Sequence, residues 1–510
     1  MMMFVLPIIV LGTCLFLHFR RDFKKLIGED SYKLPPGLQG LPIVGYLPFL
    51  GPNLHRLFME LAQTYGPIYK LGIGQKLCVI ISSPALAKEI VLRDQDVTFS
   101  NRNPNIASRV FSFDGKDIAF APLGPRWRQL RTILVREMQS EASFDASYLL
   151  RRNEVKKSVA IIYGNVGHAI DIGELAFTTV VNIIAGMFWG NVDGRQVAGI
   201  DIGTEFRAAA GRLVQNLGRP NVSDFFPILA RFDIQGVQKD MKKVMQQVDK
   251  IYDIVIDQRI KRGNMGEDEV NDDGKKNLLQ FLLEFREHDT GEPISHEQIK
   301  ALLMDIVIGG TDTTSTTVEW AMAEMMLHPE VMVKAQLELT EVVGLDNEVE
   351  ETHVKNLRYL HAVVKETLRL HPVAPLLLPR SPTKSCHVSG YAIPKDTKVF
   401  LNVWAMHRDP EFWESPLEFK PERFLGDKLD YLGQHLHYLP FGSGRRVCAG
   451  LRLGERMVMY LLATLVHMFL WESPDGTMPD TSEKLGVVLE KSNPLLLVPT
   501  PRLGSSKFYV

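Results

Sequence analysis

The sequence predicts a mainly α-helical fold, in which a large helical part and a smaller β-rich part follow an N-terminal transmembrane helix. Three observations lead to this prediction. An uncharged, mostly apolar run opens the chain, helical periodicity fills most of the remainder, and strand-like segments are confined to three regions. No repeat of the solenoid type is present. We therefore expect one globular unit behind a membrane anchor.

Residues 1–19 form the predicted anchor. They carry no formally charged side chain, and at about 1.5 Å per residue they span about 28 Å, close to the roughly 30 Å of a bilayer core. A cleaved signal peptide is the alternative, but no basic residue precedes the run and no clear small-residue cleavage site follows it. Basic residues after the run predict a cytosolic location for the remaining chain, namely Arg20, Arg21, Lys24 and Lys25.

Residues 20–50 are a basic and proline-rich hinge, and residues 51–510 are the predicted globular domain. Proline and glycine in "LPPGLQGLPIVG" exclude both a continuing helix and a central strand. Helical periodicity in the domain predicts long helices at 125–138, 145–163, 170–188, 238–262, 275–286, 295–327, 329–343, 356–370 and 449–471. Strand-like segments lie near 67–82, 373–402 and 485–498.

Charge and cysteine content exclude several classes of function. The net charge is −2, so no whole-chain attraction to nucleic acid is expected. The four cysteines form no CxxC pair, which predicts neither a zinc site nor a disulfide framework. An isolated cysteine is then packing filler, a nucleophile, or a ligand whose other partners are not protein.

Cys448 is such a cysteine, in "PFGSGRRVCAG" at 440–450, directly before an apolar helix. The positive end of that helix, together with Arg445 and Arg446, is expected to favour the thiolate. The glycines remove side chains, so that something flat or bulky can approach the backbone. A phosphate-binding loop would need a lysine and a hydroxyl that are absent here. A nucleophilic cysteine with a histidine base stays open.

Phe441, Gly444, Arg446, Cys448 and Gly450 match the pattern FxxGxRxCxG. The stretch resembles the haem-binding loop of the cytochrome P-450 monooxygenases. The resemblance implies the cytochrome P-450 fold, haem b as cofactor, and the Cys448 thiolate as axial ligand of the haem iron. Other stretches, including "HRDPEFWESPLEFKPERF", resemble the plant microsomal branch near its flavonoid and terpenoid hydroxylases.

A glycine pair interrupts the apolar helix predicted at 295–327, in "DIVIGGTDTTSTT". Each glycine costs about 1 kcal/mol inside a helix, so Gly309 and Gly310 need a compensating role. Close packing against another helix is one explanation. The resemblance implies another, in which this stretch is the (A/G)GxDT motif and passes over the distal haem face. Asp312 and Thr313 then deliver protons for the activation of dioxygen.

In "KETLRLHP", Glu366 and Arg369 stand three residues apart on one helical face. An exposed pair of this kind contributes only a few tenths of a kcal/mol, roughly, and carries little meaning. The resemblance implies a buried pair closed by Arg423 of "PERF". Because buried charges persist only when every partner is hydrogen-bonded, a third member is physically expected. We assign these residues a structural role.

Trp127 and Arg131 lie four residues apart in "PRWRQLRTILV". Alone, such a pair is usually packing beside surface charge. The resemblance implies a WxxxR helix that donates to a haem propionate, a task suited to the planar fork of arginine. Arg380 and Arg446 match two further propionate contacts.

The resemblance covers nearly the whole chain and implies a membrane-bound haem-thiolate monooxygenase with residues 51–510 as catalytic domain. It would be a single-pass protein of the endoplasmic reticulum and insert one oxygen atom of O2 into a lipophilic small molecule, a terpenoid or a flavonoid/phenolic secondary metabolite. Electrons are expected from NADPH through a separate cytochrome P-450 reductase, because no G-x-G-x-x-G follows a strand. Cytochrome b5 is a second expected partner, and Arg445 and Arg446 could assist docking.

The substrate pocket is expected in mostly apolar stretches: the 106–121 loop, the helix face before Gly309, residues 373–378 and residues 487–489. Each stretch fits a protein core equally well. Two other functions stay open. A haem-thiolate isomerase or dehydratase, such as an aldoxime-converting enzyme, would not insert oxygen. A haem-free, membrane-anchored binding protein would not need the intact Cys448, Asp312 and Thr313.

Overall fold

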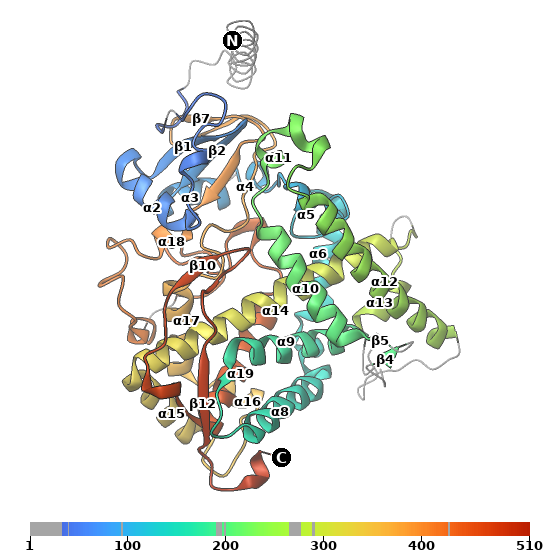
Figure 1. Ribbon diagram of the computed structural model, residues 1–510, viewed down its shortest axis with the longest axis vertical. Coiled ribbons are helices and arrows are strands. Elements are labelled where there is room, and N and C mark those ends of the chain that lie inside the picture. The colour runs from blue at the N-terminus through green and yellow to red at the C-terminus, as the bar shows by residue number, and fades with distance from the viewer. Residues whose placement is uncertain are drawn as a thin grey trace, which may run out of the picture.

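The computed structural model describes residues 33–509 except 39, 93–94, 190–195, 198–199, 265–276, 288–290 and 427–428. The predicted anchor at 1–19 and the first part of the hinge lie outside these residues. Among the residues described, no helix combines the length and the apolar character needed to cross a bilayer. The described chain is mainly helical, and its β-rich part, with β1, β2 and β7, lies at one end of the molecule (Figure 1).

Long helices make up the larger part. The central helix is α14 (His296–Leu327), which packs against α9 (Ile172–Trp189), α17 (Arg358–Leu370) and α19 (Leu451–Met468). A capping box at Ser295 and Gln298 begins α14. The other helices of this part are α6 (Pro125–Met138), α8 (Tyr148–Gly164), α10 (Ile202–Gly218), α12 (Val237–Asn264), α13 (Leu278–Glu284) and α15 (Pro329–Val342). The nine predicted helices are therefore confirmed, each end within three residues of its predicted position.

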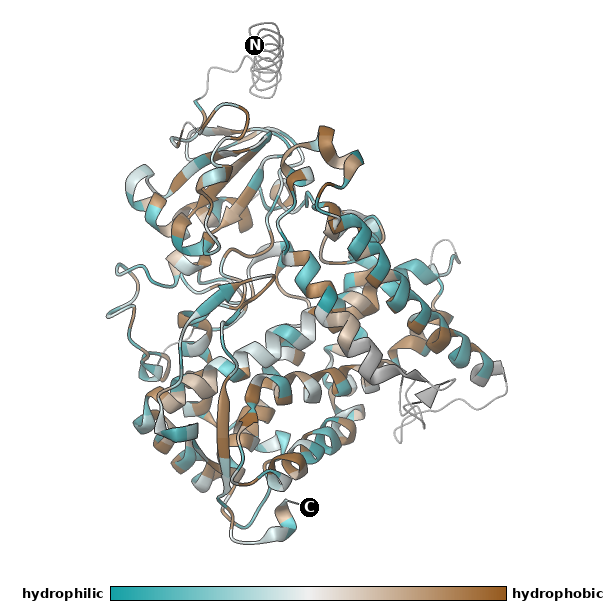
Figure 2. Cartoon of the chain, viewed as in Figure 1, coloured by the Kyte–Doolittle hydropathy of each residue, from teal (hydrophilic) through white to brown (hydrophobic). Residues whose placement is uncertain are grey.

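Helix α12 shows why these segments are helical. Its apolar residues recur every three or four positions, and Met241, Val244, Val248 and Ile251 are buried. Lysines and acids occupy the other positions, so the helix alternates between brown and teal in Figure 2. Burying that apolar stripe against the neighbouring helices stabilises the helix far more than its intrinsic propensity does.

Short helices connect the larger elements. They are α2 (Leu54–Tyr65), α3 (Pro84–Val91), α4 (Asp96–Phe99), α5 (Ile106–Phe111), α7 (Glu141–Ala146), α11 (Val222–Phe225), α16 (Glu351–Val354) and α18 (Val403–Met406). Short 3₁₀ helices include η2 (Pro227–Phe232), η3 (Pro421–Phe424) and η4 (Gly444–Arg446).

The strands form small sheets. Strands β1 (Ile68–Ile73) and β2 (Lys76–Ile81) are antiparallel, and β2 pairs in parallel with β8 (Lys398–Leu401). A second sheet has the order β3 (Ile170–Asp171), β12 (Leu496–Pro501), β9 (Phe469–Glu472). The two-stranded units are β4–β5 (Gln196–Val197 and Ile200–Asp201), β6–β7 (Cys386–Val388 and Tyr391–Ile393) and β10–β11 (Glu483–Leu485 and Leu489–Lys491).

Three local predictions need correction. The helix predicted at 449–471 ends at Met468, because residues 469–472 leave it to pair with β12 as strand β9. The predicted 106–121 loop begins with helix α5, which Asn105 caps through its side-chain oxygen. Helix α10 was not predicted. Its interior glycine Gly211 weakens the local helical signal, and packing on α12 stabilises it instead.

Candidate haem site

Residues 440–450, which we call the cysteine loop, lie between α3 and the start of α19. The Cys448 N–H donates to the Phe441 carbonyl at 2.9 Å, and the Val447 N–H donates to the Gly444 carbonyl at 3.0 Å. Gly444 has φ +67°, and a Cβ there would lie 2.3 Å from the Val91 carbonyl oxygen. Only glycine fits this close approach to the end of α3. Gly450 caps α19, and its N–H interacts with the Cys448 thiol.

The Cys448 side chain is exposed, yet burial raises the pKa of its thiol. The two observations agree if the thiol opens on a space inside the protein. The Gly450 N–H and the Arg131 guanidinium lower the pKa, but their effect is smaller. We expected the helix end, Arg445 and Arg446 to favour the Cys448 thiolate. For the protein without haem this expectation is wrong, because desolvation raises the pKa of the thiol by more than the nearby positive groups lower it.

Arg445 and Arg446 contribute little to the thiol because both have other partners. The Arg445 side chain lies 3.4 Å from the Asp96 carboxylate. The Arg446 guanidinium donates to the carbonyls of Ser100 at 2.7 Å, Ile118 at 2.9 Å and Ala121 at 2.5 Å. A metal ion at Cys448, and not these arginines, would have to stabilise the thiolate.

Four arginines surround the cysteine loop, and we call Arg102, Arg131, Arg380 and Arg446 the arginine cluster. Arg131 donates to the Val447 carbonyl at 2.6 Å. Arg380 donates to the Ser443 carbonyl at 2.6 Å and to the Asp96 carboxylate at 3.2 Å. Sequence reasoning placed three of these arginines at the site.

The fourth arginine, Arg102, was missed because nothing in "SNRNP" distinguishes it from a loop residue. It donates to the carbonyls of Ala119, Leu378 and Pro379, at 3.2, 2.6 and 3.0 Å. These carbonyls belong to separate segments of the chain, so only the folded structure shows what Arg102 joins.

Trp127 supports the cluster instead of offering a free donor. Its indole N–H, which is the only donor of the side chain, donates to the Ile118 carbonyl at 3.0 Å. Its ring lies 4.6 Å from the Arg446 guanidinium and 5.6 Å from that of Arg131. These contacts leave propionate binding to the arginines and give Trp127 a cation–π supporting role.

The arginine cluster holds more positive than negative charge. Burial lowers the pKa of Arg446 to about 10, and it also lowers the pKa of Arg102, Arg131 and Arg380. Three carboxyl groups, Asp96, Asp117 and Asp305, and the Cys448 thiol are the acidic groups among the largest electrostatic causes for these four arginines. Buried cations with so few counter-charges fit an anionic ligand.

The glycine pair of α14 combines both explanations given above. Gly310 packs so closely on α9 that a Cβ would lie 2.7 Å from Ile184 Cδ1. Gly309 is exposed within an otherwise mostly buried stretch, and a Cβ there would meet open space. The Thr313 hydroxyl donates to the Gly309 carbonyl at 2.7 Å. Close packing therefore explains Gly310, whereas Gly309 borders a space that protein does not fill.

Asp312 turns to a different face of α14 and lines an open cleft of about 850 Å³. Burial, and then the Glu490 carboxylate, raise the pKa of Asp312 to about 6, while Lys484 acts in the opposite direction. The side chain can thus hold and release a proton near neutral pH.

A second carboxyl of α14, Asp305, was not predicted. Its Oδ2 accepts from the N–H groups of Ile118 and Ala119, at 2.5 and 3.2 Å. Burial and the neighbouring Asp117 carboxylate raise the pKa of Asp305 well above its usual range, and burial raises the pKa of Asp117 to about 6. The two acids fasten the 117–121 segment, whose carbonyls hold Arg446 and Trp127, onto α14.

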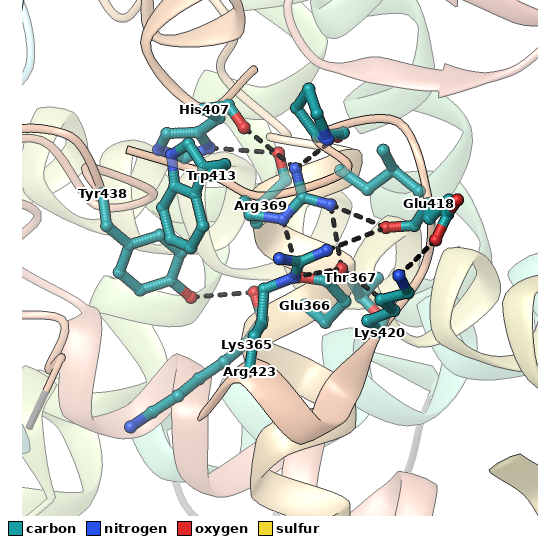
Figure 3. A network of polar contacts seen from close by, with 12 residues as sticks. Lys365, Glu366, Thr367, Arg369, His407, Trp413, Glu418, Lys420, Arg423 and Tyr438 are labelled. Carbon is teal, nitrogen blue, oxygen red and sulfur yellow. Dashed lines mark hydrogen bonds and ion pairs between the residues drawn. The ribbon is translucent and has the colours of Figure 1, made fainter. Parts of the chain in front are cut away.

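Glu366, Arg369 and Arg423 form what we call the Glu366 network, drawn in Figure 3. Arg369 donates two hydrogen bonds to Glu366, at 2.6 and 2.8 Å, and Arg423 donates a third at 3.0 Å. Glu366 and Arg369 are 0% exposed. The remaining Arg369 donors reach the carbonyls of His407, Pro416 and Glu418. The third member expected from the cost of burying two charges is therefore present.

These features fit a haem, which is a flat apolar ring with two carboxylates and an iron. The accessible Cys448 thiol offers an iron ligand, the arginine cluster offers donors for carboxylates, and Gly309 leaves space beside α14.

Comparison with known proteins shows the family of the chain. The chain matches the profile of the family Cytochrome P450 over residues 35–498. It is 36% identical to a flavonoid 3',5'-hydroxylase of Solanum melongena over 98% of both chains. It is 36% identical to a carnosic acid synthase of Salvia pomifera, over 97% of this chain and 98% of that one. A zebra fish cytochrome P450 solved with progesterone superposes with a TM-score of 0.74 at 25% identity, covering 89% of this chain and 100% of that one. The chain therefore belongs to the cytochrome P450 family and is a monooxygenase of that family.

Proposed function

We propose that this monooxygenase hydroxylates a lipophilic secondary metabolite, a terpenoid or a flavonoid/phenolic compound, at a haem held by Cys448. One observation carries the proposal: an accessible thiol inside the protein lies beside a cluster of buried arginines that are bonded mainly to carbonyls. Haem, when bound, supplies the activation of dioxygen. Each turnover uses two electrons and two protons, places one oxygen atom in the substrate and reduces the other to water.

The chain's own residues then have separate roles. Cys448 would hold the iron, and Arg131, Arg380 and Arg446 would hold the propionates. Asp312 and Thr313 move protons from solvent toward the reacting oxygen. Phe441, Gly444 and Gly450 shape the loop around the thiol, and the Glu366 network supports the fold without touching the reaction.

The substrate class rests on the relatives and on the apolar segments near the site. Flavonoid hydroxylase and carnosic acid synthase are the activities named for two relatives that match nearly the whole chain. Phe120 is partly buried in the 117–121 segment that Asp305 holds, and Phe113 is partly buried before that segment in the chain. Val488 and Leu489 were also expected in the pocket, but they are buried at 5% and 0% exposure and belong to the core.

We infer an endoplasmic reticulum location with residues 1–19 as the anchor and the catalytic domain in the cytosol. Exposed apolar residues on two segments support contact with a membrane: Leu41, Ile43, Phe49, Ile228, Phe232 and Ile234. Both segments adjoin the turn between β1 and β2, because Gly74 N–H donates to the Val44 carbonyl and Gln75 N–H to the Phe225 carbonyl. NADPH would supply electrons through a membrane-bound reductase, with cytochrome b5 as second partner. Arg445, with its side chain 49% exposed, could contact either.

Membranes that contain the protein and its reductase test the activity. With NADPH, O2 and a panel of flavonoids, phenolics and terpenoids, a product heavier by one oxygen is expected by mass spectrometry. Product without oxygen gain and without NADPH use would favour the isomerase or dehydratase. Cys448→Ala should abolish the red-shifted absorption of the reduced carbon-monoxide complex, and an unchanged spectrum would remove Cys448 as ligand.

Thr313→Ala tests proton delivery. The haem should stay bound, but NADPH use should become uncoupled from product and release peroxide. Thr311→Ala is the matched control, because the Thr311 hydroxyl makes the same bond to the carbonyl four residues earlier but is buried. Tight coupling in Thr313→Ala would contradict the role of Thr313.

A further inference from the structure

A cleft of about 850 Å³ opens to solvent between α10, α12, α14 and the β10–β11 hairpin, which lie together in Figure 1. Most of its lining side chains are polar, and they come from all four elements: Arg212, Gln215, Asn216, Arg219, Asp240, Lys243, Gln247, Asp312, Lys484 and Glu490. Among the described residues that line the cleft, none is aromatic. The cleft is therefore suited to a ligand group that forms hydrogen bonds, and not to a purely hydrocarbon ligand.

Helices α10 and α12 form one wall of the cleft, and two polar contacts join them there. Arg212 of α10 donates to Gln247 of α12 at 2.8 Å, and Arg219 of α10 pairs with Asp240 of α12 at 2.9 Å. Residue numbers rise along α10 between the two contacts and fall along α12, so the two helices run antiparallel here. Lys243 of α12 lies between the two contacts and lines the cleft.

Arg212 and Lys243 are neighbouring cations on this wall. Gln247, which accepts from Arg212, is four residues from Lys243, and residues four apart on a helix are neighbours on one face. The acid that α12 contributes to the lining, Asp240, already pairs with Arg219. Among the residues that the structure describes, neither Arg212 nor Lys243 pairs with a carboxylate. The α10–α12 wall therefore presents two adjacent positive charges to the cleft.

The side of the cleft toward α14 carries the opposite charge. Asp312 is the residue through which α14 lines the cleft, and burial raises its pKa to about 6, so its carboxyl is mostly ionised at neutral pH. Glu490 is also acidic, but it pairs with Lys484 across the hairpin at 3.3 Å. An anion in the cleft is therefore attracted to the α10–α12 wall and repelled from Asp312, so a molecule with one anionic end is oriented.

Asp312 also places this cleft next to the side of α14 that borders open space. The next residue, Thr313, donates to the Gly309 carbonyl at 2.7 Å, and a Cβ at Gly309 would meet nothing. Successive side chains of a helix point about 100° apart. The cleft and the space beside Gly309 therefore meet α14 at adjacent residues, and a ligand can have one end in each.

We propose that the substrate is a lipophilic acid, whose carboxylate binds beside Arg212 and Lys243 while the carbon to be oxidised lies beside Thr313. The inference rests on the proposed hydroxylation of a lipophilic metabolite and narrows its substrate class. The guanidinium and the ammonium donate to the two carboxylate oxygens. Gln215 and Asn216 of α10, which lie between the same two interhelical contacts, add amide donors.

Calorimetric titration of the full-length, haem-loaded protein tests the site with p-coumaric acid, geranic acid and abietic acid, each against its own methyl ester. The ester keeps the carbon skeleton and loses the charge, so at least one acid is expected to bind about tenfold more tightly than its ester. Raising sodium chloride from about 0.05 to about 0.5 M should weaken binding of the acid and leave the ester unchanged, because salt screens charge pairs near the surface.

Two variants remove one cation each and keep a hydrogen-bonding side chain. Lys243→Gln and Arg212→Gln should each weaken binding of the acid about three- to tenfold without changing that of the ester. Lys243→Arg keeps the charge and should bind the acid like the wild type. Lys242→Gln is the matched control, because Lys242 is the adjacent exposed lysine of α12 and does not line the cleft. It should leave both affinities unchanged.

The outcomes separate this inference from the proposed function. Esters that bind as tightly as the acids, an equal loss for acid and ester in Lys243→Gln, or no binding of any acid would overturn the inference. Oxygen gain in an ester or another neutral compound, measured by mass spectrometry with reductase and NADPH, would then still support the proposed function. Preferred binding of an acid through Lys243, with no oxygen gain in any acid or neutral compound, would contradict the proposed function and leave the anion site standing.

Discussion

The Glu366 network and the arginine cluster both bury charged side chains, but they balance them differently. In the Glu366 network both arginines bond directly to a carboxylate, because Glu366 accepts from Arg369 and from Arg423, and the remaining Arg369 donors end on carbonyls. In the arginine cluster, four guanidiniums are bonded mainly to carbonyls and share few acids. Carbonyls satisfy donors but do not neutralise charge. The network is complete as protein, whereas the cluster needs an anion from outside the chain.

The largest loss of stability is expected from a substitution that breaks the Glu366 network. Glu366→Gln would leave the buried Arg369 and the partly buried Arg423 without this counter-charge and should cost about 3–5 kcal/mol, a large fraction of the stability of a typical domain. We expect little folded protein and a strongly lowered urea midpoint. The matched control is Lys334→Gln, which removes an exposed pair with Glu422 and should change the unfolding free energy by less than about 1 kcal/mol. Equal effects of the two variants would show that the network is not structural.

Breaking the arginine cluster should affect the haem before it affects the fold. Arg446→Gln keeps a donor for the carbonyls but removes a charge, so we expect a folded protein that releases haem about tenfold faster or more to an apomyoglobin acceptor. Arg423→Gln provides the contrast, because it should lower the unfolding free energy without a specific effect on haem release. Normal haem retention in Arg446→Gln would contradict the assignment of the cluster to the propionates.

The comparison also separates what the sequence predicted from what it did not. Glu366 and Arg369 are three residues apart on one helix, so local spacing placed them together, and the cost of burial called for a third partner. Arg102 and Asp305 were missed because their partners lie 17 to 277 residues away in the chain. The pKa of Cys448 was mispredicted for the same reason. Helix dipole and neighbouring arginines can be read from local sequence, but the burial that outweighs them depends on the whole fold.

A smaller, pH-dependent effect on the free energy of unfolding is expected from the Asp117–Asp305 pair. This pair fastens the 117–121 segment, whose carbonyls accept from Arg446. Both acids bind a proton more tightly in the folded protein than in the unfolded chain. The two protonated carboxyls therefore contribute fully to the free energy of unfolding below about pH 4, and this contribution is lost as pH rises through about 6 and beyond. Asp117→Asn should make the free energy of unfolding depend less on pH and raise it by on the order of 2 kcal/mol near neutral pH. Urea midpoints at pH 5 and 7.5 measure it.

Asp145→Asn serves as the control for that measurement, because Asp145 is exposed on α7 and away from the pair. Its pH dependence should follow the wild type. A wild-type midpoint that rises between pH 5 and 7.5, with no change in Asp117→Asn, would show that the two carboxyls are ionised in the folded protein.

The smallest change in stability is expected from alanine at Gly309 or Gly310. The two variants distinguish a glycine that packs against protein from a glycine that borders the space for the cofactor. Alanine is better than glycine in a helix interior by about 1 kcal/mol. In Gly310→Ala this gain meets a Cβ 2.7 Å from Ile184 Cδ1, and overpacking of about 1–3 kcal/mol should cancel or exceed it. In Gly309→Ala the Cβ meets open space, so the urea midpoint of the haem-free protein should rise slightly. The haem-loaded protein should gain less or nothing, because the methyl group enters the space that the cofactor and its ligands need. An equal rise of the urea midpoint with and without haem would show that neither the haem nor its ligands occupy the space beside Gly309.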